Sequence, residues 1–393
     1  MRKIVFVFLF ILLGYLTSCS VSNNPTKYPG YGNIPENFIM GEYELSSDST
    51  ITEQNLTCIA HDDNVYYEAW LDLISEYEGA FNYYHTFIKL KTNNRLVIYT
   101  PKDAYVELTL LDEEGNAIYT SMPNKNGVCY LYPNWYASYY NVLVTYFDKD
   151  TSLKVTEEIS VSRNRDFTLN INASKVEKEL IDLMFVVDTT ISMGDELEYL
   201  KNEISNVVSE VSSFNNCSVN VSVLLYKDKG EIYETLYSDF TLDVNTQIQF
   251  LSNKIAYGGG DFEECVDVAI EEAYSKNWST NSTKILVHIG DAPAHDEDID
   301  KWYNSVLDLC GKGITLITVA GSGTNVKTEY LFRSMTLLTN GTYVALTNDS
   351  GLGEDHLDPS IDLELTIEYL DNCLVRLISS YHTGRSYYPI PIN

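Results

Sequence analysis

Positive charge is scarce in this sequence. Its 393 residues include 26 Lys and Arg against 56 Asp and Glu, so the formal net charge at pH 7 is −30. Proteins that bind nucleic acid neutralise phosphates with Lys and Arg, and this balance therefore argues against a nucleic-acid partner. An acidic surface of this kind favours a well-hydrated exterior and the binding of cations.

Several motifs of catalysis and metal binding are absent as well. None of the seven cysteines belongs to a CxxC pair, which disfavours a zinc site built from thiolates. No GK[ST] follows the run Gly258–Gly260, so this run is not a nucleotide-binding loop, and no GxSxG elbow is present. Buried free thiols and disulfides formed after export both remain open for Cys58, Cys129, Cys217, Cys265, Cys310 and Cys373.

The N-terminus reads as an export signal. The basic start MRK precedes the apolar run IVFVFLFILLGYL, which is short for a membrane span, and the segment closes with LTSC. This ending resembles a bacterial lipobox, and the resemblance implies cleavage before Cys19 and a lipid on that cysteine. An ordinary signal peptide with a chance cysteine is the alternative. We thus expect a signal peptide over 1–18, a flexible tether over 19–41, and an exported protein anchored to a membrane by lipid.

The next two segments differ in pattern. Residues 42–90 contain apolar positions at helical spacing around Trp70 and Ile74, which predicts a short helical segment. Residues 91–173 consist of short runs rich in Val, Ile, Thr and Tyr, separated by turns such as EEGN and NKNG, and predict a small all-β sandwich. The stretch AYVELTLLDEEGNAIYTSMPNKNGVCYLYP resembles the carboxypeptidase regulatory-like and related Ig-like modules.

Strands and helices alternate from about Ser174 onward. Continuous apolar runs such as LIDLMFVVD and TKILVHIGD are separated by amphipathic helices, which predicts an α/β doubly wound parallel sheet of Rossmann-like type over 178–380. The fold class is therefore multidomain, with this unit preceded by the β-sandwich and followed by a tail over 381–393. We expect residues 178–380 to fold as an autonomous unit.

Acidic residues close two of the expected strands. Asp188 ends LIDLMFVVD and Asp291 follows KILVHIG, and ligands of such sheets bind at the carboxyl ends of the strands. Thr190 and Ser192 follow Asp188 at alternate positions, where their side chains can point the same way. Carboxylate and hydroxyl oxygens are ligands for hard cations, so we expect one Mg²⁺ or Ca²⁺ here. A helix N-cap at Thr190 or Ser192 is the simpler alternative, but it explains only one hydroxyl.

The segment FVVDTTISM resembles the DxSxS signature of von Willebrand factor A domains. The resemblance implies a metal-ion-dependent adhesion site in which Asp188, Thr190 and Ser192 come from the first loop and Asp291 from the third. The second loop, YGGGDFEE, offers Asp261 where the family usually has a threonine. The sequence departs from related secreted proteins at Ile191, where they have glycine, and at Glu263 or Glu264, where a proline would fall.

Two histidines flank Asp291, but their spacing gives little support for zinc. We interpret His288 as a core residue of its strand and His295 as a surface or supporting hydrogen-bonding residue.

Two classes of function fit these residues. The resemblance implies a non-enzymatic binding module that holds a protein partner, of unknown identity, through a partner acidic residue that completes the metal's coordination. The alternative is a metal-dependent hydrolase or phosphatase in which Asp188 attacks phosphorus. VVDTTIS superficially resembles the haloacid dehalogenase phosphatases, but that family has a second aspartate two residues later, where this sequence has Thr190. We therefore expect a binding module.

Overall fold

The computed structural model describes residues 40–41, 56–88, 90, 92–350 and 356–392. The expected signal peptide, Cys19 and most of the expected tether lie outside these residues. The two described residues of the tether, Met40–Gly41, form a short strand (β1) that pairs in parallel with Ser386–Tyr387 (β17). Within the described chain no helix is long and apolar enough to cross a membrane.

An eight-stranded mixed sheet forms the centre of the described chain, in the order β12-β11-β10-β13-β14-β15-β2-β16. Five neighbouring strands run parallel, and their bounds are Leu180–Asp188 (β10), Ser218–Tyr226 (β11), Ser282–Gly290 (β13), Ile314–Ala320 (β14) and Thr342–Thr347 (β15). β12 (Thr235–Thr241) is antiparallel at one edge. The mostly parallel α/β sheet is as the strand–helix alternation predicted.

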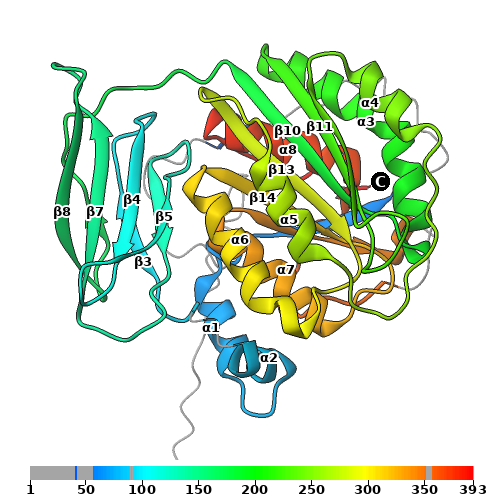
Figure 1. Ribbon diagram of the computed structural model, residues 1–393, viewed down its shortest axis with the longest axis horizontal. Coiled ribbons are helices and arrows are strands. Elements are labelled where there is room, and N and C mark those ends of the chain that lie inside the picture. The colour runs from blue at the N-terminus through cyan, green and yellow to red at the C-terminus, as the bar shows by residue number, and fades with distance from the viewer. Residues whose placement is uncertain (1–39, 42–55, 89, 91, 351–355, 393) are drawn as a thin grey trace, which may run out of the picture.

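Helices cover both faces of this sheet (Figure 1). One face packs against α3 (Gly194–Asn215), α4 (Val244–Leu251) and α8 (Leu370–Thr383), and the other against α5 (Val266–Ser275), α6 (Ile299–Gly311) and α7 (Val326–Leu338). β10 is buried on both faces because Leu183 and Phe185 enter the first core while Met184 and Val186 enter the second. This is why its sequence is almost continuously apolar.

The sheet extends beyond the segment 178–380 that the sequence assigned to it. Thr57–His61 (β2) pairs antiparallel with β15 and with Glu368–Tyr369 (β16), so one strand comes from the region expected to be a separate helical segment. The expected boundary therefore omits a strand. A short strand with no neighbouring strand in sequence carries no local sign of its partner, since pairing is decided by distant residues.

The region 42–90 does contain helices. Tyr67–Ser75 (α1) and Ala80–Ile88 (α2) lie against α7, and Trp70 stacks on Tyr330 with ring centroids 5.9 Å apart. α7 is buried around its whole circumference because these helices cover the side that would otherwise face solvent. At the other end of the chain, α8 runs three residues into the expected tail.

Residues 96–168 contain strands and no helix among the described residues. They form a three-stranded sheet, β6-β3-β9, and a four-stranded sheet, β5-β4-β7-β8. Their bounds are Leu96–Tyr99 (β3), Val106–Leu111 (β4), Ala117–Ser121 (β5), Val128–Leu131 (β6), Tyr139–Phe147 (β7), Lys154–Ser162 (β8) and Phe167–Thr168 (β9). Both sheets contribute to one apolar core, and β5 lies beside α6 of the α/β unit (Figure 1). The all-β character of this segment follows the sequence expectation.

The six described cysteines are free thiols. Cys58 of β2 and Cys373 of α8 lie within hydrogen-bonding reach of each other in the core, and burial raises the pKa of the Cys58 thiol. Five of these thiols are buried and Cys217 is half-buried, so the buried-thiol alternative fits all of them except Cys217.

Candidate metal centre

The carboxyl ends of β10, β11 and β13 meet at one edge of the sheet. Asp188 is the last residue of β10, Asp228 lies two residues beyond β11, and Asp291 directly follows β13. A fourth acid, Glu264, comes from the loop before α5, where it forms a bridge with Ala294. All four side chains are buried, with at most 6% of each residue exposed. The parallel topology thus gathers four carboxylates at one place.

Hydrogen bonds fix the first loop. Asp188 Oδ1 accepts from the backbone N–H and from the hydroxyl of Thr190, both at 2.8 Å. The Thr190 hydroxyl lies 3.4 Å from that of Ser192, which is exposed at the start of the turn before α3. The helix itself starts without a side-chain cap, so neither Thr190 nor Ser192 serves as the N-cap that the sequence left open.

One carboxylate oxygen of Asp188 and one of Glu264 are buried without a hydrogen-bond partner. These atoms are Asp188 Oδ2 and Glu264 Oε2. Burial and the neighbouring charge of Asp291 raise the pKa of Asp188 to about 7. Burial, followed by the charges of Asp188, Asp228, Asp291 and Asp261, raises the pKa of Glu264 to about 9. Anionic oxygens held together in this way favour a bound cation, which removes both the desolvation cost and the repulsion.

The nearest lysine does not supply that cation. The Lys227 ammonium group donates hydrogen bonds to the backbone carbonyls of Thr189 and Tyr257, which fixes it at the side of the site. Burial lowers the pKa of Lys227, and the charge of Asp188 opposes this shift. Lys227 therefore holds the loops together and only partly offsets the acidic charge.

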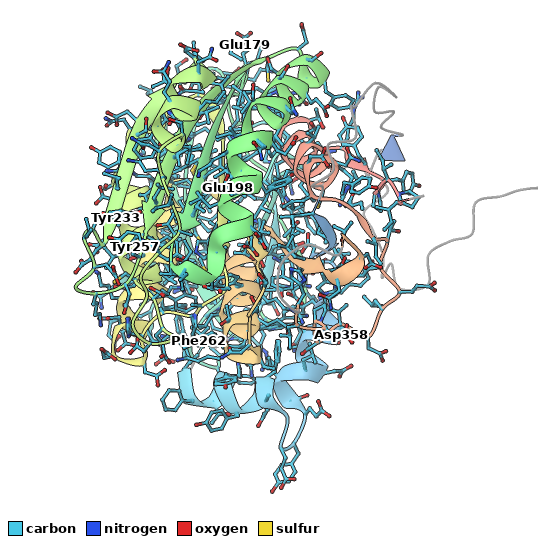
Figure 2. All side chains as sticks on the ribbon, turned by 90° about the vertical axis from the view of Figure 1, so that its right-hand side faces the viewer. Glu179, Glu198, Tyr233, Tyr257, Phe262 and Asp358 are labelled. Carbon is cyan, nitrogen blue, oxygen red and sulfur yellow. The ribbon has the colours of Figure 1, made fainter. Side chains whose placement is uncertain are left out.

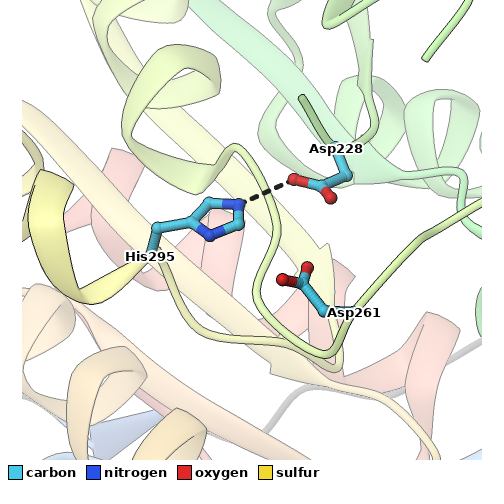
Figure 3. A group of neighbouring side chains, drawn as sticks. All are labelled: Asp228, Asp261 and His295. Carbon is cyan, nitrogen blue, oxygen red and sulfur yellow. Dashed lines mark hydrogen bonds and ion pairs between the residues drawn. The ribbon is translucent and has the colours of Figure 1, made fainter. Parts of the chain in front are cut away.

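A second group of side chains lies next to the first. Ligand atoms of Asp228, Asp261 and His295 all fall within 4.8 Å of one another (Figure 3). His295 Nε2 is 2.7 Å from Asp228 Oδ1, and both residues are buried, whereas Asp261 is exposed. The charges of both groups act on Glu264.

Residues 182–351 match the family model of the von Willebrand factor A domain. The chain contains an A domain of this family. Alpha-protein kinase vwkA of Dictyostelium discoideum is 26% identical over 200 residues, which are 50% of this chain and 32% of the kinase. Collagen alpha-5(VI) chain of Mus musculus is 24% identical over 161 residues, which are 41% of this chain and 6% of the collagen. The chain spans less than a third of the length of these relatives.

A similar solved structure is that of the conserved hypothetical protein BatB from Bacteroides thetaiotaomicron. It is 14% identical to this chain, covers 54% of this chain and 91% of its own, and has a TM-score of 0.29.

The A domain brings four of the five sequence-predicted ligands together. Asp188, Thr190 and Ser192 are joined by hydrogen bonds, and Asp291 is the charge that acts most strongly on Asp188. Asp261 instead lies in the neighbouring group with Asp228 and His295. Glu264 is a buried acid of the second loop, and the charge of Asp188 acts on it more strongly than any other. The A-domain edge can thus offer carboxylate and hydroxyl oxygens to a divalent cation.

The sequence analysis did not identify two acidic residues at this edge of the sheet, Asp228 and Glu264. Asp228 ends the segment SVNVSVLLYKD, and its position after a strand is the same signal that identified Asp188 and Asp291. Glu264 gave a weaker signal because Glu263 precedes it, and only the loop conformation shows which of the two points inward. Glu263 pairs with Lys327 at 2.9 Å, away from the buried carboxylates.

The histidines have the positions that their sequence context suggested. His288 is fully buried in β13, where Nε2 is 2.9 Å from the Tyr226 hydroxyl, and burial lowers its pKa to about 3. His295 forms a hydrogen bond with Asp228 and is buried, so of its two sequence interpretations the surface one is wrong.

Proposed function

We propose that this protein is a binding module that holds a protein partner through one divalent cation at the edge of the A domain. Asp188, Asp291 and Glu264 supply carboxylate oxygens, and Thr190 and Ser192 supply neutral hydroxyls. The observation that carries the proposal is the pair of buried oxygens without a partner, Asp188 Oδ2 and Glu264 Oε2. An oxygen-only ligand set suits Mg²⁺ or Ca²⁺.

The surroundings of this site support a protein partner. Ile191, between two ligands, is 74% exposed, and Ile232 and Phe262 are also exposed. Their three loops contact one another, since Ile191 N–H donates to Gly258 O at 3.1 Å and Gly259 N–H donates to Glu231 Oε1 at 3.0 Å. Figure 2 shows Phe262 on the same side of the molecule as Tyr233 and Tyr257. Exposed apolar side chains grouped around a polar centre are typical of interaction surfaces.

The relatives support the same class of function. A collagen chain and a kinase share this domain while differing in the rest of their length, which fits a domain that contributes binding and not one fixed reaction. The partner then offers a carboxylate to the cation and apolar groups to Ile191 and Phe262. We propose a non-enzymatic role, with no turnover of a generic phosphate ester.

We further propose that the protein is exported and attached to a membrane by a lipid on Cys19. The support is the sequence LTSC at the end of an apolar export segment. Mass spectrometry of the mature N-terminus tests it, because a chain that begins at another residue would remove the anchor from the proposal.

The binding proposal is tested by capture on the immobilised full chain. Bound surface proteins should elute with EDTA, and Asp188→Asn should capture none of them. Amidation of the carboxylates of the applied proteins should abolish capture, whereas acetylation of their lysines should not. Chelator-resistant capture, or equal capture by Asp188→Asn, would contradict the proposal.

A further inference from the structure

The group formed by Asp228, Asp261 and His295 differs chemically from the oxygen site beside it. It offers an imidazole nitrogen together with two carboxylates, with ligand atoms within 4.8 Å of one another. Asp228 and His295 are at most 8% exposed, and Asp261 faces solvent. Figure 3 shows the three side chains converging from three separate segments of the chain. The group therefore has two side chains held rigidly by burial and one open side.

A hydrogen bond between His295 and Asp228 explains only part of this arrangement. The pair at 2.7 Å is satisfied without Asp261, whose carboxylate adds a second negative charge to the same space. The lysines on either side of Asp228 act elsewhere: Lys227 donates to backbone carbonyls, and Lys229 pairs with Glu297 and Asp298. Neither lysine therefore forms an ion pair with Asp261 in the described part of the chain.

Glu264, a ligand of the proposed oxygen site, is also an electrostatic neighbour of this second group. It is 3% exposed, its Oε2 atom has no hydrogen-bond partner, and it interacts with Asp228 and Asp261 as well as with Asp188 and Asp291. One cation among Asp188, Asp291 and Glu264 leaves Asp228 and Asp261, whose carboxylate oxygens lie within 4.8 Å of each other, without a cation of their own. Two divalent cations, one in each group, would offset four of the five carboxylate charges.

We propose that Asp228, Asp261 and His295 form a second cation site that takes a divalent transition metal of the zinc type. Zinc is bound in proteins by histidine nitrogen and carboxylate oxygen, whereas Mg²⁺ and Ca²⁺ prefer oxygen alone. The two neighbouring sites therefore select different metals. This inference does not depend on the proposed partner-binding function, because none of the three ligands belongs to the oxygen site.

Metal titration of the full chain tests the second site. Calorimetry with Zn²⁺ in the presence of millimolar Mg²⁺ should give one zinc per chain, and His295→Gln should weaken that binding by at least about tenfold. His356→Gln, which removes a histidine outside this group, should leave it unchanged. Wild type that binds no zinc, or that binds it no more tightly than His295→Gln, would overturn the proposal.

Two further measurements separate this site from its neighbours. Asp188→Asn should retain zinc binding while losing the response to Mg²⁺ or Ca²⁺, and His295→Gln should show the reverse. If the oxygen site binds no Mg²⁺ or Ca²⁺, zinc binding to the second site can still be measured separately. Co²⁺ in place of zinc should give a visible spectrum without the thiolate charge-transfer band; a thiolate band would assign the ion to cysteine and contradict the proposal.

Discussion

Arg333 of α7 and Asp63, two residues beyond β2, form a bidentate ion pair in the protein interior. Nη2 lies 2.6 Å from Oδ1 and Nε lies 3.0 Å from Oδ2, while Nη1 reaches Glu329 Oε1 at 3.0 Å. Arg333 holds the pKa of Asp63 well below its usual range, although burial acts in the opposite direction. This pair connects the end of β2 to α7, and its two residues are 270 positions apart in the sequence.

Removal of Arg333 should be strongly destabilising. Arg333→Ala leaves Asp63 and Glu329 buried without their cation, which costs about 3–5 kcal/mol of unfolding free energy. Lys154→Ala, which breaks a 3.7 Å pair with Glu107 at an exposed position, should cost less than about 1 kcal/mol. Urea denaturation of both variants measures the difference. Similar losses for the two would show that the buried pair is not a structural connection.

A chain that begins at Ser174 should not fold as the A domain does in the full chain. It lacks β2, so the pairing edge of β15 is open, and Arg333 loses Asp63. Arg333→Met in this fragment should recover part of the lost stability, because it removes a buried positive charge that has lost its partner Asp63. Circular dichroism during thermal unfolding checks this. A fragment that melts cooperatively at the temperature of the full chain would restore the autonomous unit that the sequence predicted.

The oxygen site should make stability dependent on cations. Saturating Mg²⁺ or Ca²⁺ should raise the melting temperature of the wild type, since an ion at 100 times its Kd adds about 2.7 kcal/mol. Asp188→Asn keeps the acceptor for Thr190 but removes a buried charge, so its melt in EDTA should be equal or higher. Adding metal should not raise it further. A wild-type melt that is identical with metal and with EDTA would exclude the site.

Glu264 and Asp261 should have separable effects. Glu264→Gln keeps the shape of the side chain but removes its charge, so the shift caused by Mg²⁺ or Ca²⁺ should fall sharply. Asp261→Asn should largely retain that shift and lose zinc affinity instead, because Asp261 lies with Asp228 and His295. Thermal melts and calorimetry on both variants provide the comparison. The opposite pattern would assign Asp261 to the oxygen site, as the sequence suggested.

The buried His288 should destabilise the fold in acid. Burial lowers its folded-state pKa to about 3, against about 6.5 in an unfolded chain. Between these values the unfolded state binds the extra proton, so each pH unit below about 6 costs up to about 1.4 kcal/mol from this residue. His288→Gln should flatten the acid limb of stability against pH, and His356→Gln should not. Urea midpoints from pH 7 to 4 measure it, and an unchanged slope in His288→Gln would refute the assignment.

The sequence predicted the features that depend on local pattern. β10 and α3 were recognisable because apolar spacing alone separates a doubly buried strand from an amphipathic helix. Asp188 and Asp291 were found because each follows such a strand. β2 was not found, since nothing near Thr57 specifies its pairing with Thr347, and Glu264 could not be distinguished from Glu263 because only the fold decides which side chain is buried.

The place of β2 also determines how the molecule would carry mechanical load. Thr57 pairs with Thr347 at the carboxyl end of β15, so the chain enters the sheet at the same edge that bears Asp188 and Asp291. Tension applied ahead of Leu56 along the strand direction acts on the hydrogen bonds of β2 to β15 and β16 together, in shear. The Asp63–Arg333 pair, which joins the end of β2 to α7, would resist the withdrawal of that strand.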